Sequence, residues 1–446
     1  MNKFVHKISK NSLVALVLSI LCYVTISYGI ERSSFYKLLI LYTVLFASFL
    51  FLLYDNKNDE NTLLSFSFLF RLLLLFAIPN LSDDFYRFIW DGRMLWEGFN
   101  PYLYLPENNT ALVAQGQSLY QGMGAMNGSH YTCYPPVNQL TFLIPAIFFS
   151  KNLLGATVIM RLLILLADVG TYYYGKKILA LLNIPGNNIF LYLLNPFVII
   201  ELTGNLHFEA VMIFFLAAAI YYLLKNNWLV SAFYFAVSVS VKLIPLLFLP
   251  VFIKRLGLKK SLLYGGIVLG VNILFFLPFA SHELYDNFMK SIHLYFQNFE
   301  FNASIYYIIR EIGFQVKGYN IIHSVGKITP FIVAISVLLL SLLRANRNGK
   351  ILFETLLFSI CIYYSLASIV HPWYIAIPLF FSVFTQYKFP LLWSFVVVLS
   401  YAAYQNISYK ENLYFVGLEY LVVYTAFFYE ILFLNKKSSF RIGNLR

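Results

Sequence analysis

Long apolar runs separated by short polar connections occupy most of this 446-residue chain. A helix that crosses a membrane needs about 20 consecutive, predominantly apolar residues. The pattern therefore predicts an all-α, polytopic bundle of about 12–14 membrane-spanning helices. The predicted spans are Asn11–Ile30, Tyr36–Tyr54, Thr62–Pro79, Val137–Ser150, Leu153–Leu179, Asn188–Leu202, Phe208–Leu224, Trp228–Ile253, Ser261–Ala280, Thr329–Leu343, Ile351–Val370, Pro372–Thr385, Phe389–Tyr404 and Leu413–Leu434.

Trp228–Ile253 is too long for a single span, and it is interrupted by Lys242 and Pro245. Proline removes a helical hydrogen bond and clashes with the preceding turn. We therefore expect a pair of short helices, with Lys242 at the bend between them. An ammonium at membrane depth is costly unless it is paired or faces a cavity, so Lys242 is a candidate for holding a lipid phosphate.

The composition agrees with a membrane protein, because 60% of the residues are hydrophobic and only 12% are charged. A soluble domain carries roughly 25% charged residues. The net charge of +12 does not indicate a nucleic-acid partner, because most Lys and Arg residues lie in short connections between apolar runs, where they set topology. The three cysteines show neither a disulfide framework nor a metal-binding spacing.

The basic residues predict the orientation, because cytoplasmic connections carry an excess of Lys and Arg. Both termini are expected in the cytoplasm, from Lys3, Lys7 and Lys10 at the start and from Lys436, Lys437 and Arg441 at the end. The polar, aromatic loops then fall on the opposite face. We expect one domain over residues 1–446, in which the first outer loop (80–136) and a second outer loop (281–327) form a cap. The abundance of Lys, Asn, Ile, Phe and Tyr favours a bacterial plasma membrane.

The first outer loop opens with the densest group of acids and aromatics, SDDFYRFIWDGRMLWEGFNPY at Ser82–Tyr102. A transfer of sugar to a hydroxyl needs a carboxylate that takes the hydroxyl proton, and Asp83 and Asp84 are the first candidates. Neighbouring helical residues differ by about 100°, so only one of the two is expected to face the site. Ser82 is a suitable N-cap, and the positive helix end is expected to lower the pKa of an acid in the first turn.

Asp91 has two readings, a ligand for sugar or metal and a partner of Arg87 four residues earlier. A divalent cation held by Asp83, Asp84 and Asp91 is left open. Arg71, Arg161 and Asp168 lie inside apolar runs. The spacing of seven places Arg161 and Asp168 on one helical face, where a structural contact within the bundle is the expected role.

The remaining candidates lie in other polar segments assigned to the same face. Asn205 is a plausible N-cap with His207 and Glu209 at the outer end of a span, and His371, Trp373 and Tyr374 open another span. Trp and Tyr there are also typical of the membrane interface. The candidates for substrate contact are Tyr86, Arg87, Asp91, Tyr134, Asn205, His207, Glu209, Lys242, Asn302, Arg310, His371, Trp373 and Tyr374.

The order of these segments resembles the GT-C superfamily of membrane glycosyltransferases. The motifs are SDDFYRFIWDGRMLWEGFNPY, YPP, GNLHFEA, VKLIP, NASIYY and HPWY, between Leu81 and Tyr374. The resemblance is to bacterial polyprenol-phosphate-mannose-dependent mannosyltransferases. It implies a polyprenyl-phosphate sugar donor, transfer on the outer face with inversion, and an Asp base that by spacing is Asp84 rather than Asp83. Where many relatives read Gly-His, this chain reads Leu206-His207.

These expectations describe a membrane hexosyltransferase that moves mannose to a glycan or glycolipid acceptor. Lys242 and Arg310 would neutralise the phosphate leaving group. His207, Glu209, His371 and Trp373 would contact sugar. The alternatives are transfer of glucose or an aminoarabinose-type sugar, and a transporter of lipid-linked sugars or polysaccharides. A transporter is expected to show matching broken helices in two halves, and the sequence has no such symmetry.

Overall fold

The computed structural model describes residues 8–406 and 409–439. Over these residues the chain is helical and forms no strand, apart from an isolated bridge between Phe301 and Ile369. The expected all-α bundle is therefore confirmed. Lys3, Lys7 and Arg441 lie outside the described residues, as do the side chains of Lys436 and Lys437.

The α-helices are α1 Lys10–Gly29, α2 Phe35–Asp55, α3 Glu60–Leu73, α4 Asp84–Trp96, α5 Gly116–Gly128, α6 Pro136–Phe149, α7 Leu153–Leu181, α8 Phe190–Leu193, α9 Pro196–Val198, α10 Glu209–Leu224, α11 Trp228–Val241, α12 Ile253–Leu256, α13 Leu258–Phe276, α14 Leu284–Gln297, α15 Ile305–Lys317, α16 Ile322–Leu343, α17 Gly349–Leu366, α18 Ala376–Ser382, α19 Phe389–Val396 and α20 Leu413–Ser439. The short 3₁₀ elements are η1 Pro101–Leu103, η2 Pro106–Asn108, η3 Thr110–Leu112, η4 Gly186–Ile189, η6 Ile244–Phe252, η7 Leu277–Phe279, η8 Pro372–Ile375 and η9 Val397–Gln405. A π-helical turn, η5, covers Ile199–Gly204.

Seven of the described helices are long and apolar enough to cross a membrane, namely α1, α2, α7, α13 with η7, α16, α17 and α20. An eighth span is counted if Pro196–Gly204 and α10, which meet at 113°, are taken together. Four shorter apolar helices accompany them. The fold is thus polytopic, but fewer helices have full length than the 12–14 expected, because predicted spans such as Thr62–Pro79 become short helices like α3.

The predicted break at Lys242 is confirmed. Helix α11 ends at Val241, Lys242 is extended with φ −153° and ψ 138°, and the chain continues as η6. The backbone amide of Lys242 still donates to the carbonyl of Ser238. The lysine therefore leaves the helix at its last turn and its side chain is free to point away from the α11 axis.

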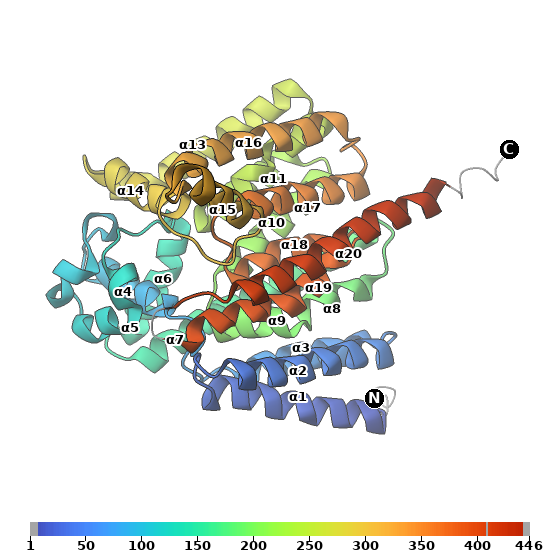
Figure 1. The fold of residues 1–446 in the computed structure, drawn as a ribbon, viewed down its shortest axis with the longest axis horizontal. Helices are drawn as coiled ribbons and strands as arrows, with labels where there is room; N and C mark the ends of the chain where they lie inside the picture. Colours follow the sequence, from blue (N-terminus) through green and yellow to red (C-terminus); the bar gives the residue numbers. More distant parts are fainter. Residues whose placement is uncertain (1–7, 407–408, 440–446) are drawn as a thin grey trace.

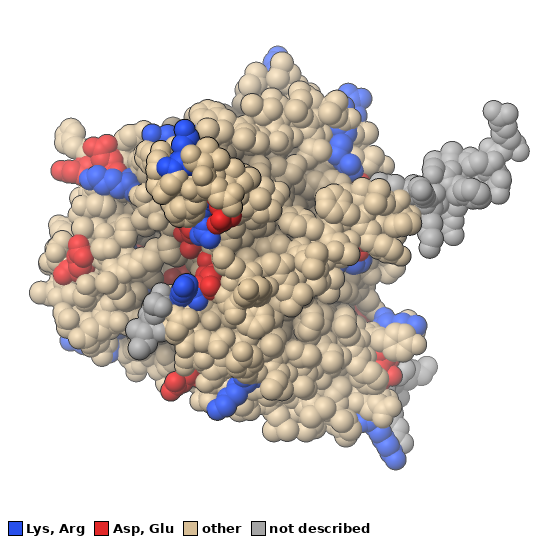
Figure 2. Space-filling view, in the orientation of Figure 1, with Lys and Arg blue, Asp and Glu red and all other residues tan. Residues whose placement is uncertain are grey.

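Figure 1 shows how the two predicted outer loops gather at one end of the molecule. The first loop contributes α4 and α5, and the second contributes α14 and α15, while α1 begins and α20 ends at the opposite end. Figure 2 shows a broad surface with few charges between these two ends, and charged side chains also gather in a recess beside α15. This distribution suits a bundle whose middle lies in lipid and whose ends lie in water.

A buried ion pair joins two helices in the interior, but its partners differ from the expected ones. Asp168 on α7 accepts from Nε of Arg71 on α3 at 2.7 Å, and both side chains are almost fully buried. Arg161, expected to face Asp168, instead donates to four backbone carbonyls, those of Leu75, Ala77, Thr203 and Gly204. The seven-residue spacing gave the correct face of α7 but could not identify which neighbouring helix each side chain meets.

We predict that Asp168→Ala strongly destabilises the protein, because it leaves the Arg71 guanidinium buried without its counter-charge. Breaking a buried pair from one side typically costs about 3–5 kcal/mol. Thermal unfolding of the purified protein in detergent should show a large drop in Tm. Asp286→Ala on α14, at an exposed position, is the matched control and should leave Tm nearly unchanged. A similar Tm for both variants would contradict a stabilising role for the pair.

Candidate active site

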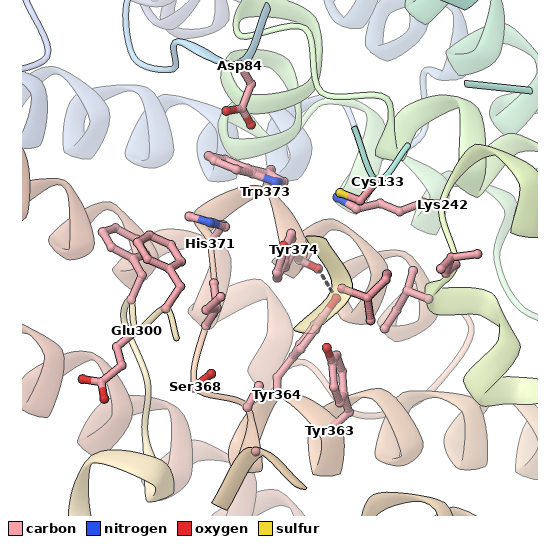
Figure 3. A pocket seen from close by; sticks show the side chains of 18 of the residues that line it. Asp84, Cys133, Lys242, Glu300, Tyr363, Tyr364, Ser368, His371, Trp373 and Tyr374 are labelled. Atoms are coloured by element: carbon pink, nitrogen blue, oxygen red, sulfur yellow. Dashed lines mark hydrogen bonds between the residues drawn. The ribbon is translucent and has the colours of Figure 1, made fainter. Parts of the chain in front are cut away.

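A cavity of about 910 Å³ lies where the capping loops meet the helix bundle. Its lining comes from parts of the chain that are far apart in sequence, among them the start of α4, the Lys242 bend, the segment around Glu300, and the stretch from α17 to η8. Figure 3 shows several of these side chains directed into the same space. The predicted site residues that line it are Asp83, Asp84, Tyr134, Glu209, Lys242, His371, Trp373 and Tyr374.

The cavity has sides of different character. Its apolar side is formed by residues of η6 and α16, namely Leu243, Ile244, Leu247, Val325, Gly326, Thr329, Pro330, Val333 and Ala334. Helix α16 is one of the helices long enough to span a membrane. The polar residues Asp84, Glu209 and Lys242 line the same cavity as this apolar side. The cavity can therefore hold a molecule that combines a charged or polar group with a hydrocarbon chain.

Helix α4 positions Asp84 at its first residue, with Asp83 as the N-cap. The buried face of α4 packs on α6, where Phe88 stacks on Phe142 with ring centroids 4.7 Å apart. Gly92 permits this close approach, because a Cβ there would lie 1.9 Å from the carbonyl oxygen of Phe142. The start of α4 is thus held against the bundle, and the Asp84 carboxylate is fixed at the cavity.

The pKa of the Asp84 carboxyl is raised to about 6, mainly by burial and also by the nearby Asp83 and Glu209, while Lys242 and a hydrogen bond from Asn127 act in the opposite direction. That hydrogen bond is long, 3.4 Å from Asn127 Nδ2 to Asp84 Oδ1. The expectation that the helix end would lower this pKa is therefore wrong in direction. Loss of hydration outweighs the helix-end effect at this position.

Asp83 is held differently from its neighbour. Its carboxylate accepts from the Arg32 guanidinium at 2.6 Å, and its side chain is 42% exposed. The cation that pairs with Asp83 is thus Arg32, in the turn between α1 and α2, rather than Arg87. This pairing leaves Asp84 as the acid with the less satisfied carboxylate.

A sharp corner places His207 behind Asp84. The π-helical turn Ile199–Gly204 meets α10 at 113°. Leu206 lies in this corner with φ +63°, a left-handed conformation in which glycine would be unstrained. The position where relatives were expected to carry glycine therefore keeps the glycine-like backbone with a leucine.

His207 has its two ring nitrogens in different surroundings. Nδ1 lies 2.8 Å from the carbonyl oxygen of Glu201, which fixes Nδ1 as the donor. Nε2 is buried without a hydrogen-bond partner and lies 3.9 Å from Oδ2 of Asp84. His207 is not among the residues that line the cavity, so its ring lies behind Asp84.

Trp373 lies between two histidines. Its ring stacks on His207 at 3.8 Å between centroids and on His371 at 4.5 Å. Burial and the nearby Lys242 ammonium lower the pKa of His371 to about 3, so its ring is neutral at physiological pH. Figure 3 shows Trp373 and His371 between Asp84 and the rest of the cavity. Both faces of Trp373 are thus covered by histidine rings, so Trp373 and His371 line the cavity with their edges.

Lys242 points into the cavity from the break after α11. Its ammonium pairs with Glu209 at the start of α10 and lies 4.7 Å from the centroid of the Tyr374 ring. Glu209 is almost fully buried, whereas 27% of the Lys242 side chain is exposed. Lys242 is therefore held in place by one buried partner and keeps an accessible side that could meet an anion.

Three predicted residues of the first loop lie in packed surroundings away from the cavity wall. Arg87 pairs with Asp91 at 2.8 Å, in the i,i+4 arrangement, and donates to two backbone carbonyls of the loop. Gln139 also donates to Asp91. Tyr86 packs closely on Gly122 of α5. Together these contacts hold the loop against α4 and α6.

The other predicted residues that do not line the cavity are Asn205, Asn302 and Arg310. Asn205 donates to the Glu201 carboxylate at 3.2 Å. Asn302 donates to the buried carboxylate of Glu419 on α20. Arg310 pairs with Glu300 and lies over the Tyr307 ring, 4.2 Å from its centroid. Arg310 therefore meets a protein carboxylate, not the space beside Lys242.

The sequence interpretation missed Arg32, Asn127, Glu201 and Tyr404. Arg32 and Tyr404 line the cavity, and Arg32 lies 4.3 Å from the centroid of the Tyr404 ring. Arg32 had a detectable signal, since it is a basic residue in a short turn assigned to the outer face, opposite the basic cytoplasmic connections. Glu201 also had a signal, since it is an acid inside the predicted span Asn188–Leu202. Its partner Tyr401, which donates to it at 2.6 Å, is 200 residues away and could not be foreseen.

The arrangement offers a carboxylate with raised pKa, a lysine, and aromatic rings around one cavity. Such a carboxylate can take a proton, and such an ammonium can stabilise developing negative charge. Within the described ranges, no three residues among His, Cys, Asp and Glu come together as a metal site would require. No step is therefore assigned to a metal.

Comparison with known families decides where this chain belongs. A family model described as "Alpha-(1->6)-mannopyranosyltransferase, N-terminal domain" matches residues 14–256, more than half of the chain. The chain belongs to this family. A second model, described as "ALG3 protein", matches residues 205–355. Both matches include the Asn205–Glu209 corner and the Lys242 bend, and they place the chain among mannosyltransferases of the GT-C type, as its motifs predicted.

Two curated relatives resemble part of the chain. One is Alpha-(1->6)-mannopyranosyltransferase A of Corynebacterium glutamicum, 25% identical over 187 residues, which are 40% of this chain and 35% of the relative. The other, with the same name, is from Mycobacterium tuberculosis and is 23% identical over 189 residues, 42% of this chain and 35% of the relative. The matched region thus spans about a third of each relative's length. No solved structure matches.

We predict that Asp84 titrates with a midpoint near pH 6, as its burial requires. Infrared difference spectra should show a protonated carboxyl in the unmodified protein at pH 5 that is absent from Asp84→Asn. Because the folded pKa is above the unfolded value, ionised Asp84 costs stability as the pH rises through about 6. Asp84→Asn should therefore match or exceed the unmodified protein in Tm at neutral pH. A midpoint near 4 would contradict the assignment.

Proposed function

We propose that this protein is an integral membrane mannosyltransferase that moves mannose from a polyprenyl-phosphate donor to a hydroxyl of a glycan or glycolipid. The relatives' names supply mannose as the sugar. Asp84 serves as the base, and transfer inverts the anomeric carbon. The single observation that carries the proposal is the meeting of Asp84, Lys242 and an apolar side in one cavity.

The donor fits this cavity by its chemistry. A polyprenyl phosphate has a long hydrocarbon chain and an anionic head, and the apolar side along η6 and α16 begins directly after Lys242. The lipid lies along that side, which continues a membrane helix. The phosphate meets the exposed part of the Lys242 ammonium. The mannose then lies toward Trp373 and Asp84.

In the proposed step, the bonds formed and broken, the proton and the charge are all accounted for. The acceptor oxygen forms a bond to the anomeric carbon, and the bond from that carbon to the phosphate oxygen breaks. The acceptor proton goes to Asp84, and the electron pair leaves with the polyprenyl phosphate, which gains one negative charge. Lys242 stabilises that charge where it develops. A carboxylate of raised pKa is a stronger base than an exposed one, which suits proton removal.

The next part of the proposal is the orientation of the protein in the membrane. We propose that the end bearing α4, α5, α14 and α15 lies on the non-cytoplasmic face and that both termini are cytoplasmic. The support is the distribution of Lys and Arg in the connections. A bacterial plasma membrane is the proposed location, in agreement with the bacterial relatives.

The direct test is transfer of radiolabelled mannose from synthetic polyprenyl-phosphate mannose to a membrane acceptor by the purified full-length protein. Asp84→Asn should lower turnover by at least about 100-fold, the usual scale for a general base. Asp83→Asn should lose much less turnover, because Asp83 is paired with Arg32. The kcat/KM of the unmodified protein should fall as the pH falls through about 6, because kcat/KM reports the pKa of Asp84 in the donor-free protein.

Polyprenyl-phosphate glucose and an aminoarabinose-type donor, assayed in parallel, separate mannose transfer from the alternative sugars. Transfer at equal rates by Asp84→Asn and the unmodified protein would rule out Asp84 as the base. Movement of a lipid-linked sugar across the bilayer without transfer would favour a transporter and reject the proposal.

A second prediction concerns Lys242. Lys242→Met removes the charge, and we expect roughly 100-fold slower transfer, the scale of one lost stabilising donor. This variant also leaves Glu209 buried without its partner. The double variant Lys242→Met/Glu209→Gln removes that charge and is the needed control. Turnover that stays low in the double variant supports the phosphate role.

Recovery of turnover in the double variant would show that Lys242 only neutralises Glu209. Cys133 adds a readout independent of turnover, because it lines the cavity while Cys22 and Cys361 are buried. Donor should protect Cys133 of the unmodified protein from a maleimide. The same donor concentration should protect it less in Lys242→Met/Glu209→Gln.

A further inference from the structure

The cavity has a second polar region, apart from the Lys242 bend and the apolar side. We name it the polar corner and define it by Arg32, Asp83, Glu300, Phe301, Tyr404 and Glu411, all of which line the cavity. These residues come from the α1–α2 turn, the start of α4, the segment before α15 and the segment before α20. In the view of Figure 3, Glu300 lies on the opposite side from Lys242.

We propose that the polar corner is the binding subsite for an uncharged saccharide acceptor, with the part of the Tyr404 ring that Arg32 leaves uncovered as its contact surface. This proposal rests on the proposed function and adds where the acceptor binds. Nothing in the family comparisons covers this part of the site fully, because the longer match ends at residue 256 and the second at residue 355. Tyr404 and Glu411 lie beyond both.

The first argument is the position of Asp83. Asp83 and Asp84 are neighbours in the chain, so their Cα atoms are about 3.8 Å apart. That distance is shorter than the width of a pyranose ring. Both residues also line the same cavity, so a sugar that donates a hydroxyl to Asp83 lies beside Asp84. The polar corner thus begins beside the proposed base.

The second argument is that the Arg32 guanidinium and the Tyr404 ring are held in place beside each other. Arg32 donates to Asp83 at 2.6 Å, and its guanidinium lies over one face of the Tyr404 ring, 4.3 Å from the centroid. Both contacts hold the Arg32 side chain, which is 19% exposed. Planar guanidinium groups bind paired oxygens with defined direction. A rigid donor, a carboxylate acceptor and an aromatic face are the groups that recognise a polyhydroxylated ring.

The third argument is the continuity of aromatic rings from this corner to Asp84. Tyr404 lies 6.0 Å from Phe301, Phe301 lies 5.1 Å from His371, and His371 stacks on Trp373. Trp373 in turn stacks on His207, which faces Asp84. Tyr404, Phe301, His371 and Trp373 all line the cavity, so their edges border a continuous path from the polar corner to the reacting centre.

Charge distinguishes this corner from the donor side. Its lining contains three carboxylates, Asp83, Glu300 and Glu411, against one cation, Arg32. Glu300 is already paired with Arg310, and Glu411 accepts from Tyr307. A lipid phosphate is repelled by such surroundings and is attracted by Lys242. Neutral hydroxyls, which both donate and accept, suit a wall of satisfied carboxylates.

The experiment measures KM for donor and acceptor separately, with full-length protein, polyprenyl-phosphate mannose and octyl α-D-mannopyranoside as acceptor. Tyr404→Ala should raise the acceptor KM about tenfold, the scale of one aromatic contact. The donor KM should change by less than about twofold. Tyr404→Phe keeps the ring and should restore the acceptor KM. Tyr285→Ala, which removes an exposed tyrosine of α14 outside the cavity lining, is the matched control.

A second variant, Asp83→Asn, should also raise the acceptor KM while leaving the donor KM near its original value. Tm measurements must show that each variant is folded. An unchanged acceptor KM in folded Tyr404→Ala, or an equal rise in donor KM, would overturn the acceptor subsite while leaving the mannosyltransferase intact. Absence of transfer by the unmodified protein from any polyprenyl-phosphate sugar would instead reject the proposed function, and the subsite with it.

Discussion

The structure is governed by the cost of placing charge in an apolar interior, where each ion needs a partner. Arg71 meets Asp168 between α3 and α7, Arg161 donates to four carbonyls, and Glu419 accepts from Trp393 and Asn302. Breaking such a pair is strongly unfavourable. These contacts therefore select which helix faces meet, and they fix the helices that carry the site.

Asp84 departs from this rule. Its carboxylate receives one long hydrogen bond from Asn127, at 3.4 Å, and the unpartnered Nε2 of His207 lies 3.9 Å away. Proteins tend to place such incompletely satisfied, pKa-shifted groups at functional sites. The contrast with Asp91, which accepts from both Arg87 and Gln139, is a physical reason to assign the chemistry to Asp84.

The sequence predicted much of the fold because periodicity and local chemistry act within one segment. The apolar runs, the break at Lys242 and the i,i+4 pair of Arg87 with Asp91 follow from neighbours in the chain. The Arg71–Asp168 pair and the His207–Trp373 stack do not, since their partners come from distant helices. Arg32 was missed for the same reason, although its position in an outer turn was unusual.

The pKa of Asp84 shows how magnitudes decide between two local effects. A helix N-terminus stabilises a carboxylate by about 0.3–1 kcal/mol, which is less than one pKa unit. Burial can raise a carboxyl pKa by up to about 3–5 units. Sequence alone reveals the helix start but not the depth of burial. The prediction therefore included only the smaller, helix-end effect, and it gave the wrong direction for the pKa shift of Asp84.

The same electrostatic interaction couples donor binding at Lys242 to proton removal by Asp84. In the free protein, the Lys242 ammonium holds down the pKa of Asp84. A donor phosphate on Lys242 would neutralise that ammonium and add negative charge beside the carboxylate. Asp84 would then bind a proton more strongly when the donor is present than when it is absent. Donor binding would thus strengthen the base at the moment when an acceptor hydroxyl must lose its proton, and a donor-free site would hold a weaker one.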